Sequence, residues 1–253
     1  MKITFLGTGT SQGIPMIANN DPVCLSDNPR DKRLRSSIMI SWNDIRYIID
    51  CGPDFRQQML RENIQSINGV LFTHEHADHT AGIDDLRPYT YKMGEVPIYA
   101  QERVIENLKV RFSYIFETEN RYAGAPKLTE NTIDSTSFML SGVQVTPLAV
   151  MHGNLPITGY RFGNVAYITD LKTMSDQEKK KLENLEILIV NALRIDAHPT
   201  HLNLEEALAF VNEIKPKRAY FTHISHKLGF HEDVEKILPE NVFLSYDGLQ
   251  ITL

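Results

Sequence analysis

Three histidines and one aspartate lie within six consecutive positions of the chain, at residues 74–79. They are His74, His76, Asp78 and His79. Neutral imidazoles and a carboxylate are good ligands for zinc, manganese or iron. One helical face cannot gather all four side chains, whereas a sharp turn can direct them at two neighbouring points, so the spacing predicts two metal ions. The alternative is a polar turn with solvated histidines, but a random turn rarely holds this many ligand types at this spacing.

The element that must position these ligands is a short strand. Residues 70–72 are Val-Leu-Phe, an apolar run that predicts a buried strand directly before the ligand stretch. The ligands therefore lie at the C-terminal end of a strand, in a turn that opens a helix. The stretch is not the zincin motif His-Glu-x-x-His, because Asp78 stands where the second histidine would be.

The pattern His74-x-His76-x-Asp78-His79 resembles the signature of the metallo-β-lactamase superfamily. The resemblance implies an α/β fold, a four-layer αββα sandwich with a dinuclear metal site at one edge. It also implies three further ligands downstream, in the order histidine, aspartate, histidine. In the main subclass of zinc β-lactamases a cysteine takes the place of this aspartate, whereas an aspartate there is typical of phosphoester hydrolases.

Three residues at the ends of predicted strands match that order. His152 follows a strand over residues 143–150, Asp170 follows one over residues 165–169, and His223 follows one over residues 218–221. By the resemblance, each of two divalent ions has three ligands of its own and one residue bridges them: His74, His76 and His152 for the first, Asp78, His79 and His223 for the second, and Asp170 between them. Zn²⁺ and Mn²⁺ both suit this set of nitrogen and oxygen donors.

Such a centre implies phosphodiester hydrolysis. Two metal ions about 3.5–4 Å apart can hold a bridging hydroxide at neutral pH, bind phosphoryl oxygens and neutralise the charge that develops on attack at phosphorus. We predict two catalytic residues, Asp78 and His201. We predict that His201 is the general acid that protonates the leaving alkoxide. The setting of His201, in residues 201–207, is similar to the histidine motif before a helix in tRNA 3′-processing enzymes (tRNase Z) and in PhnP-like enzymes. A surface-loop histidine is the alternative for His201, and for His198 as well.

The PhnP-like group offers the nearest resemblance. Residues 7–11, the loop over residues 15–37 and residues 222–226 all resemble that group, which hydrolyses 5-phosphoribosyl 1,2-cyclic phosphate and other phosphodiesters. We therefore expect a small phosphodiester substrate. Residues 7–11 also look like a phosphate-cradling loop, but no helix pattern begins there and a tight turn is the better interpretation.

The chain departs from the PhnP-like pattern at a second, structural zinc site. That group places a Cys-x-Cys motif early in the long loop and a histidine three places after the last metal histidine. Here His226 stands at the histidine place, whereas Asn19 and Asp21 occupy the cysteine places and only Cys24 remains nearby. Because asparagine is a poor zinc ligand, we expect this site to be absent or altered.

Three further features have two interpretations each. Asp50, at the end of a predicted strand, either supports the metal histidines or caps a helix. The mixed charge run of residues 27–35 is either a solvated surface segment or brings Arg33 or Arg35 to an anionic substrate. The aromatic side chains of residues 113–135 either pack this predicted flap onto the body of the protein or stack on a base or sugar.

Composition sets the remaining expectations. With 253 residues, of which 42% are hydrophobic, the chain is expected to form a single domain over residues 1–253 with a flap insertion around residues 113–135. The formal charge of −6 makes nucleic acid an unexpected partner. No apolar run approaches the roughly 20 residues needed to span a bilayer, and two cysteines make no disulfide framework, so we expect a cytoplasmic protein. A homodimer is left open.

Three other functions compete with a phosphodiesterase. A tRNA 3′-processing nuclease would share the metal site, but it normally needs a basic, Gly/Pro-rich arm. A non-catalytic metal-binding module would not need His201. A dinuclear-iron redox enzyme or a thioester hydrolase uses the same fold, but the His-Thr-Pro-Gly-His string of glyoxalase-type relatives is missing near His152.

Overall fold

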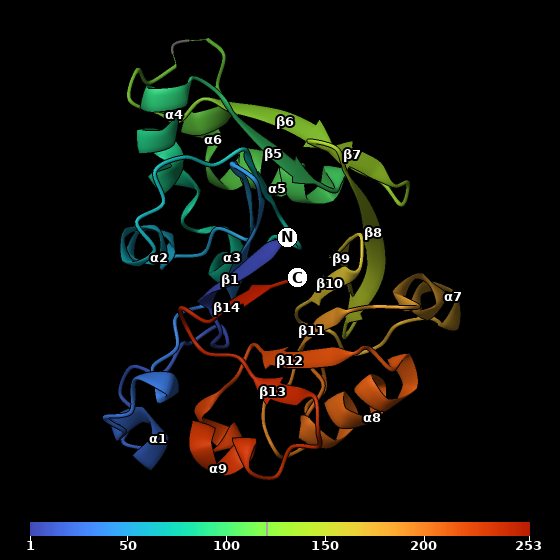
Figure 1. The fold of residues 1–253 in the computed structure, drawn as a ribbon. Helices are drawn as coiled ribbons and strands as arrows, with labels where there is room; N and C mark the ends of the chain where they lie inside the picture. The colour runs from blue at the N-terminus through green and yellow to red at the C-terminus, as the bar shows by residue number, and fades with distance from the viewer. Residues whose placement is uncertain (120) are drawn as a thin grey trace. The chain divides into compact units, whose positions relative to one another are not determined.

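The computed structural model describes residues 1–119 and 121–253, and these divide into two compact units. The first unit comprises residues 1–6, 37–134 and 248–253, and the second comprises residues 7–36 and 135–247. Each unit is built on one seven-stranded β-sheet (Figure 1). Within the described part of the chain, no helix combines the length and the apolar character needed to cross a membrane.

The sheet of the first unit has the strand order β14-β1-β2-β3-β4-β5-β6. The strands are β14 (Gln250–Thr252), β1 (Lys2–Gly7), β2 (Ser37–Trp42), β3 (Ile45–Ile49), β4 (Gly69–Leu71), β5 (Val96–Ala100) and β6 (Leu128–Thr132). β1 is antiparallel to β14 and β2 to β3, whereas β3 to β6 run parallel to one another. The β2–β3 hairpin has the bounds that the sequence predicts, since two apolar runs flank an Asn-Asp turn in which Asn43 adopts φ 51°.

The segment predicted as a flap contributes part of this sheet. Leu128–Thr132 pairs in parallel with β5, from Val96 opposite Leu128 to Ala100 opposite Thr132. Its sequence, LTENT, is mostly polar and has no buried residue. An edge strand can be polar because one of its sides has no partner strand, which is why hydrophobic patterning does not identify it.

Helices pack on one face of the first sheet. They are α2 (Phe55–Arg61), α3 (Ala77–Thr80), the 3₁₀ turn η2 (Ile83–Leu86), α4 (Arg87–Met93), α5 (Glu102–Arg111) and α6 (Ser113–Phe116). Phe55 and Met59 from α2 and Leu108 from α5 form one buried cluster with Val70 and Ile98 of the sheet. The strand that precedes the ligand stretch is thus fixed by a packed core.

The sheet of the second unit has the strand order β13-β12-β11-β10-β9-β8-β7. The strands are β13 (Val242–Leu244), β12 (Arg218–Thr222), β11 (Ile187–Asn191), β10 (Val165–Ile168), β9 (Leu155–Phe162), β8 (Val143–His152) and β7 (Phe138–Leu140). The strands β10 to β13 are parallel and β7 to β10 are antiparallel. The parallel strands read as continuous apolar runs because both faces are buried.

The longest helix of the second unit, α8 (Leu204–Ile214), packs Ala207 and Phe210 into the second core cluster. The shorter helices are α1 (Pro22–Leu25), η1 (Pro29–Asp31), α7 (Asp176–Lys179), η3 (Lys180–Leu182), η4 (His226–Leu228) and α9 (His231–Glu235). A capping box opens α8, since Asn203 accepts from the N–H of Glu206 and Glu206 accepts from the N–H of Asn203. The N-cap of α8 is thereby fixed two residues after His201.

Candidate metal centre

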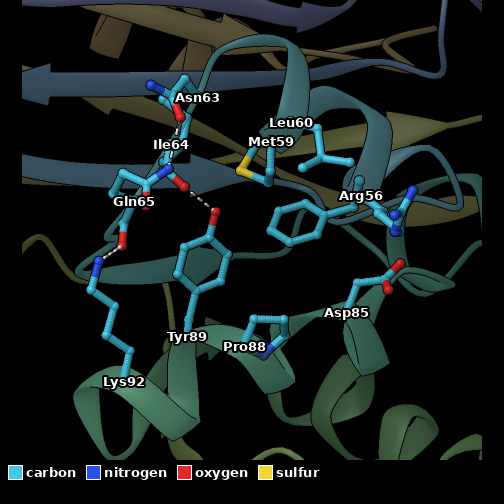
Figure 2. Close-up of a pocket in the computed structure, with 11 residues that line it drawn as sticks. Arg56, Met59, Leu60, Asn63, Ile64, Gln65, Asp85, Pro88, Tyr89 and Lys92 are labelled. Atoms are coloured by element: carbon cyan, nitrogen blue, oxygen red, sulfur yellow. Dashed lines mark hydrogen bonds between the residues drawn. The ribbon is translucent and has the colours of Figure 1, made fainter.

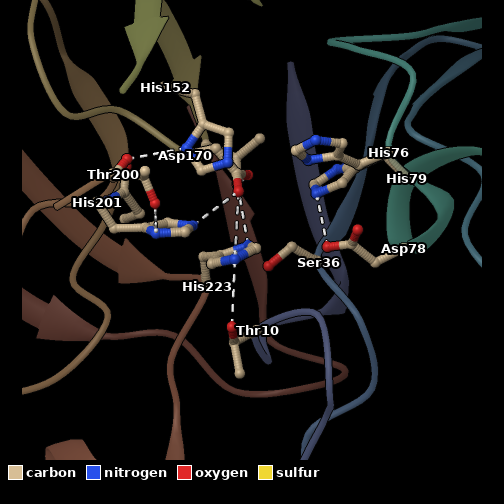
Figure 3. Close-up of polar contacts among 12 residues, drawn as sticks. Thr10, Ser36, His76, Asp78, His79, His152, Asp170, Thr200, His201 and His223 are labelled. Carbon is tan, nitrogen blue, oxygen red and sulfur yellow. Dashed lines mark hydrogen bonds and ion pairs between the residues drawn. The ribbon is translucent and has the colours of Figure 1, made fainter. Parts of the chain in front are cut away.

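The first unit gathers four of the predicted ligands in one turn after β4. His76 occupies the N-cap of α3, and Asp78 and His79 lie in its first turn. The Nε2 atom of His74 lies 3.0 Å from Nδ1 of His76. Nε2 of His79 lies 3.0 Å from a carboxylate oxygen of Asp78 (Figure 3). Two donors that each bind one ion at about 2 Å lie roughly 3 Å apart, so both pairs are spaced as metal ligands.

Asp50 holds this turn in place through hydrogen bonds. Its side chain is fully buried and accepts hydrogen bonds from the backbone N–H and the hydroxyl of Thr73, both within 3.1 Å, while Nδ1 of His79 lies 2.7 Å away. Burial raises the pKa of Asp50, and His79 and Thr73 oppose that rise by stabilising the charged form. Of the two interpretations of Asp50, helix capping is therefore wrong, because the N-cap of α2 is Asp54 and Asp50 contacts the histidine instead.

A glycine lets the ligand turn pack against the Asp50 loop. The N–H of Gly82 donates to the carbonyl of Cys51, and the N–H of Cys51 donates to the carbonyl of His79. A Cβ added at Gly82 would lie 2.1 Å from the carbonyl oxygen of Gly52, a distance that real atoms do not reach. Only glycine, which has no side chain, therefore fits at this position, and the close approach of the two loops fixes the position of the His79 backbone.

The second unit gathers the remaining predicted ligands around Asp170. One oxygen of the Asp170 carboxylate lies 3.0 Å from Nε2 of His201 and 3.3 Å from Nε2 of His223 (Figure 3). The other oxygen accepts from the Thr169 hydroxyl at 2.6 Å. His152 is at the end of β8 and completes, with Asp170 and His201, a group of donor atoms within 4.8 Å of one another. This group is nearly buried and mixes nitrogen and oxygen donors.

In four of the five predicted ligand histidines, the second ring nitrogen is held by the protein. In His74 it lies 2.9 Å from the Thr73 hydroxyl, in His79 2.7 Å from Asp50, in His152 2.8 Å from the Thr200 carbonyl and in His223 3.3 Å from the Thr169 hydroxyl. Such contacts fix the tautomer and leave the other nitrogen available to an ion, as in most protein metal sites. The donor chemistry of both sets therefore fits divalent metal ions.

Three strand-end residues of the site have unusual backbone conformations. Asp50, Asp170 and His223 have φ of 66°, 56° and 55°, in the left-handed region that non-glycine residues seldom adopt. Each follows a central strand of its sheet and is at most 2% exposed. Residues held in such conformations cluster at functional sites, where the surrounding packing maintains them.

Threonines next to the ligands are part of the site that ligand spacing does not identify. The hydroxyl of Thr10 lies 3.3 Å from Nε2 of His223. Thr10 belongs to the glycine-containing loop that follows β1, which the sequence predicts as a tight turn. Thr73 and Thr169 directly precede His74 and Asp170, so adjacency to a ligand is the one signal that could have identified them.

Arg33 is buried, and both interpretations of it are wrong. It is 4% exposed and donates to the Thr8 hydroxyl, the Ser245 carbonyl and Nδ1 of His231, so it neither lies in solvent nor reaches a substrate. Burial lowers the pKa of Arg33 to about 10, so it keeps its charge at neutral pH. Arg35 is partly exposed and its Nε–H donates to the carbonyl of Ser11.

The segment that corresponds to the structural zinc site contains a hydrogen bond between side chains. The amide nitrogen of Asn19 lies 3.2 Å from Nε2 of His226. Asp21 caps α1 by accepting from the N–H of Val23, and Cys24 is buried in the second core cluster. Asp21 and Cys24 thus have contacts other than with His226.

Two of the aromatic side chains of residues 113–135 pack onto the first unit, as one of the two interpretations predicts. Tyr114 donates to Asp84 at 2.7 Å, and both Tyr114 and Phe116 pack against the first core cluster. Tyr122 is 60% exposed, and the Arg87 guanidinium lies 5.7 Å from the centre of its ring. Packing therefore accounts for Tyr114 and Phe116 but not for Tyr122.

The first unit also has a cavity of about 380 Å³ beside α2 and α4 (Figure 2). Phe55, Met59 and Tyr89 form its apolar lining, and Arg56 and Lys92 are among its polar residues. None of the predicted ligands is among the described residues that line it. The cavity is thus a different feature from the ligand turn.

Comparison with known proteins places the chain in a family. Residues 45–224 match the model of the β-lactamase superfamily domain. A solved structure described as a new diphosphatase from the PhnP family superposes with a TM-score of 0.93, at 39% identity, over 100% of this chain and 97% of that one. The Zn²⁺-bound PqqB from Methylobacterium extorquens shares the fold with a TM-score of 0.81 at 19% identity, over the full length of both chains.

Two curated relatives are longer than this chain. An octanoyltransferase of Porphyromonas gingivalis is 39% identical over 254 residues, which are 99% of this chain and 51% of that protein. A ribonuclease Z of Methanococcus maripaludis is 25% identical over 262 residues, which are 100% of this chain and 68% of that protein. The chain thus spans about half the length of the first of them.

The chain belongs to the metallo-β-lactamase superfamily and, within it, to the PhnP family. Two mixed sheets, each with helices packed on it, are the α/β fold of that superfamily, which confirms the predicted fold class. Its clustered histidine and aspartate side chains are groups that could hold metal ions.

Proposed function

We propose that this protein is a dinuclear metal-dependent phosphodiesterase whose substrate is a small cyclic phosphate such as 5-phosphoribosyl 1,2-cyclic phosphate. The observation that carries the proposal is the carboxylate of Asp170, on which the imidazoles of His201 and His223 converge within 3.3 Å. An aspartate at this place is typical of phosphoester hydrolases of the superfamily. The diphosphatase of the PhnP family, 39% identical over the whole chain, supports hydrolysis at phosphorus.

We propose that the ligands of both units serve one pair of ions, because their order along the chain is that of the family. One ion would be held by His74, His76 and His152, the other by Asp78, His79 and His223, with Asp170 bridging them. When bound, two divalent ions such as Zn²⁺ or Mn²⁺ supply charge neutralisation at the phosphoryl group and a nucleophile at neutral pH.

The chain's own residues would hold and orient these groups. Asp50 and Thr73 keep His79 and His74 in place through their second nitrogens. His201 directs Nε2 toward the carboxylate of Asp170 and is 11% exposed, so it is accessible to a leaving group. We propose that His201 gives a proton to the leaving alkoxide from this nitrogen.

Metal dependence is tested with paired measurements on ligand variants. We expect His76→Ala and Asp170→Ala to lose bound metal, counted by elemental analysis, and turnover of bis(p-nitrophenyl) phosphate together. The matched control is His226→Ala, which removes a histidine that contacts Asn19 and belongs to neither ligand set. Full turnover by a metal-depleted Asp170→Ala protein would contradict the proposal.

The substrate is tested with the same metal-loaded protein. Chelator-sensitive cleavage of 5-phosphoribosyl 1,2-cyclic phosphate, much faster than that of the aryl diester, is the expected result. Cleavage of the aryl diester alone would retain the phosphodiesterase and reject the cyclic substrate. If neither ester is cleaved with Zn²⁺ or Mn²⁺, the proposal is wrong.

A second candidate is RNA 3′-end processing, favoured by the ribonuclease Z relative at 25% identity. The net charge of −6 weakens it, because RNA binding relies on cationic side chains. Cleavage of a tRNA precursor in preference to small esters would support it. The octanoyl transfer named for the other relative belongs to a protein about twice as long as this chain.

A further inference from the structure

His198 lies beside the proposed general acid and has no place among the predicted ligands. Its ring centre is 4.9 Å from that of His201, and the two Nδ1 atoms are 3.1 Å apart. Both histidines belong to the loop between β11 and α8. This loop is tied down at both ends, since the N–H of Leu193 donates to the carbonyl of Leu202 and the amide of Asn203 donates to the carbonyl of Ile195.

The backbone of Thr200 determines which atom of His198 can carry a proton. The N–H of Thr200 points at Nδ1 of His198, 3.3 Å away. A backbone N–H can only donate, so Nδ1 of His198 must present its lone pair, and the proton of the neutral ring is on Nε2. Burial and the neighbouring cations lower the pKa of His198, which favours this neutral form.

The proton between the two rings therefore belongs to His201. Nδ1 of His198 carries no proton, so Nδ1 of His201 is the donor across the 3.1 Å contact, and the lone pair of His198 is shared between this N–H and the N–H of Thr200. The Thr200 hydroxyl, 3.0 Å from the same nitrogen of His201, lies on this side of the ring as well. With Nδ1 held in this way, Nε2 of His201 points to the opposite side, where it lies 3.0 Å from Asp170.

A metal ion between His198 and His201 does not explain this contact. Among the described residues, the groups whose ligand atoms converge include His201 with His152 and Asp170, but none includes His198. The contact between the two rings is thus a hydrogen bond that orients one of them.

We propose that His198 is a positioning residue: it accepts the Nδ1–H of the protonated His201 ring and so fixes the ring orientation that presents the Nε2–H of His201 to the leaving oxygen. When Nε2 has given up its proton, the neutral His201 ring keeps the other proton on Nδ1, still bonded to His198. This inference rests on the proposed phosphodiesterase activity. Asp50 orients His79 and the Thr200 carbonyl orients His152 through hydrogen bonds of the same kind. Loss of such a partner typically reduces metal affinity or activity 10- to 100-fold.

The experiment measures kcat and KM of the metal-loaded protein on aryl methyl phosphates, from p-nitrophenol to phenol as leaving group. A general acid matters most for the poor leaving group. We expect His201→Ala to reduce kcat on the phenyl ester by at least about 100-fold, and His198→Ala to reduce it by about tenfold, with KM and the nitrophenyl ester little changed.

Two further variants separate positioning from a merely structural role. His198→Asn should restore most of the kcat on the phenyl ester, because its side-chain oxygen can accept where Nδ1 does, whereas His198→Gln should not. His198→Ala should have no effect when His201→Ala is already present. If His198→Ala does not fold, the comparison of Asn with Gln still tests the proposal. The control is Asp196→Asn, an exposed residue of the same loop.

Failure of the inference is distinct from failure of the proposed function. If the wild-type protein cleaves the esters and His198→Ala matches it, or slows all esters equally, His198 does not position the acid. A further loss in the double variant below His201→Ala alone would also refute the inference. If the wild-type protein cleaves no ester with Zn²⁺ or Mn²⁺, the phosphodiesterase itself is refuted.

Discussion

Replacing His231 by asparagine should remove much of the acid sensitivity of folding. His231 begins α9, and its side chain is 2% exposed. Its Nδ1 accepts from the buried guanidinium of Arg33 at 3.0 Å, and its backbone N–H donates to Asp31. Protonation of this ring would put a second positive charge against Arg33 and remove the acceptor that Arg33 uses.

The groups around His231 shift its pKa in opposite directions. Burial, together with the charges of Arg33 and Arg30, lowers its pKa to about 4, while the charge of Asp31 opposes this shift. Glu235 lies 4.0 Å from Nε2, and the rings of His231 and Tyr246 meet edge to face with their centres 5.8 Å apart. The ring is therefore neutral in the folded protein at pH 7.

The sign of the pH dependence follows from the two states. A histidine in the unfolded chain has a pKa of about 6.5, so between pH 6.5 and 4 the unfolded state binds more protons than the folded one. Stability is therefore complete above pH 6.5 and falls with pH toward 4. From pH 7 to pH 5 the loss is about 2 kcal/mol, and it approaches about 3 kcal/mol below pH 4.

The assay is urea unfolding, followed by circular dichroism, of chelator-treated protein at pH 7 and pH 5. His231→Asn retains an acceptor for Arg33 but does not titrate, so its free energy of unfolding should fall by about 2 kcal/mol less than that of the wild type over this interval. His226→Asn, which replaces a half-exposed histidine, is the control. Equal losses in the wild type and His231→Asn would refute the reasoning.

Three other substitutions have expected outcomes. Asp50→Asn should weaken metal affinity by about 10- to 100-fold in a chelator competition, because it removes the charge that orients His79, and an unchanged affinity would contradict this. Gly82→Ala should cost about 3 kcal/mol or more in thermal unfolding, since its Cβ would lie 2.1 Å from the Gly52 carbonyl oxygen, and a midpoint equal to that of the wild type would show that the turn can move. Asn203→Ala should cost about 1 kcal/mol in urea unfolding through loss of the α8 cap, with Glu205→Ala as a control in the same helix turn.

The ligand turn could be predicted from the sequence because its information is local. His74, His76, Asp78 and His79 lie in one turn after an apolar strand, so their types and spacing suffice. The bounds of β2 and β3 and the capping box of α8 are local in the same way, since a hairpin turn and an N-cap depend on neighbours a few residues away.

The long-range partners were decided only by the tertiary structure. Arg33 stands in a run of charges that reads as solvated, yet it donates to Ser245 and His231, about 200 positions further along the chain. Hydrophobic periodicity reports whether a side chain is apolar, not whether a distant acceptor is available to a buried charge. A buried cation is stable only where acceptors form hydrogen bonds to it. No local sequence pattern indicates whether residues from distant parts of the chain provide those acceptors.

The same distinction separates His201 from His198. The histidine before a capped helix could be predicted, because the motif and the cap are contiguous in the sequence. The role we infer for His198 depends on the direction of the Thr200 N–H and on a contact of 3.1 Å between two rings. Those are properties of a folded loop, since a hydrogen bond forms only within a narrow range of distance and angle. The residue types in this protein thus determine its chemistry, and the folded backbone determines which of them can act together.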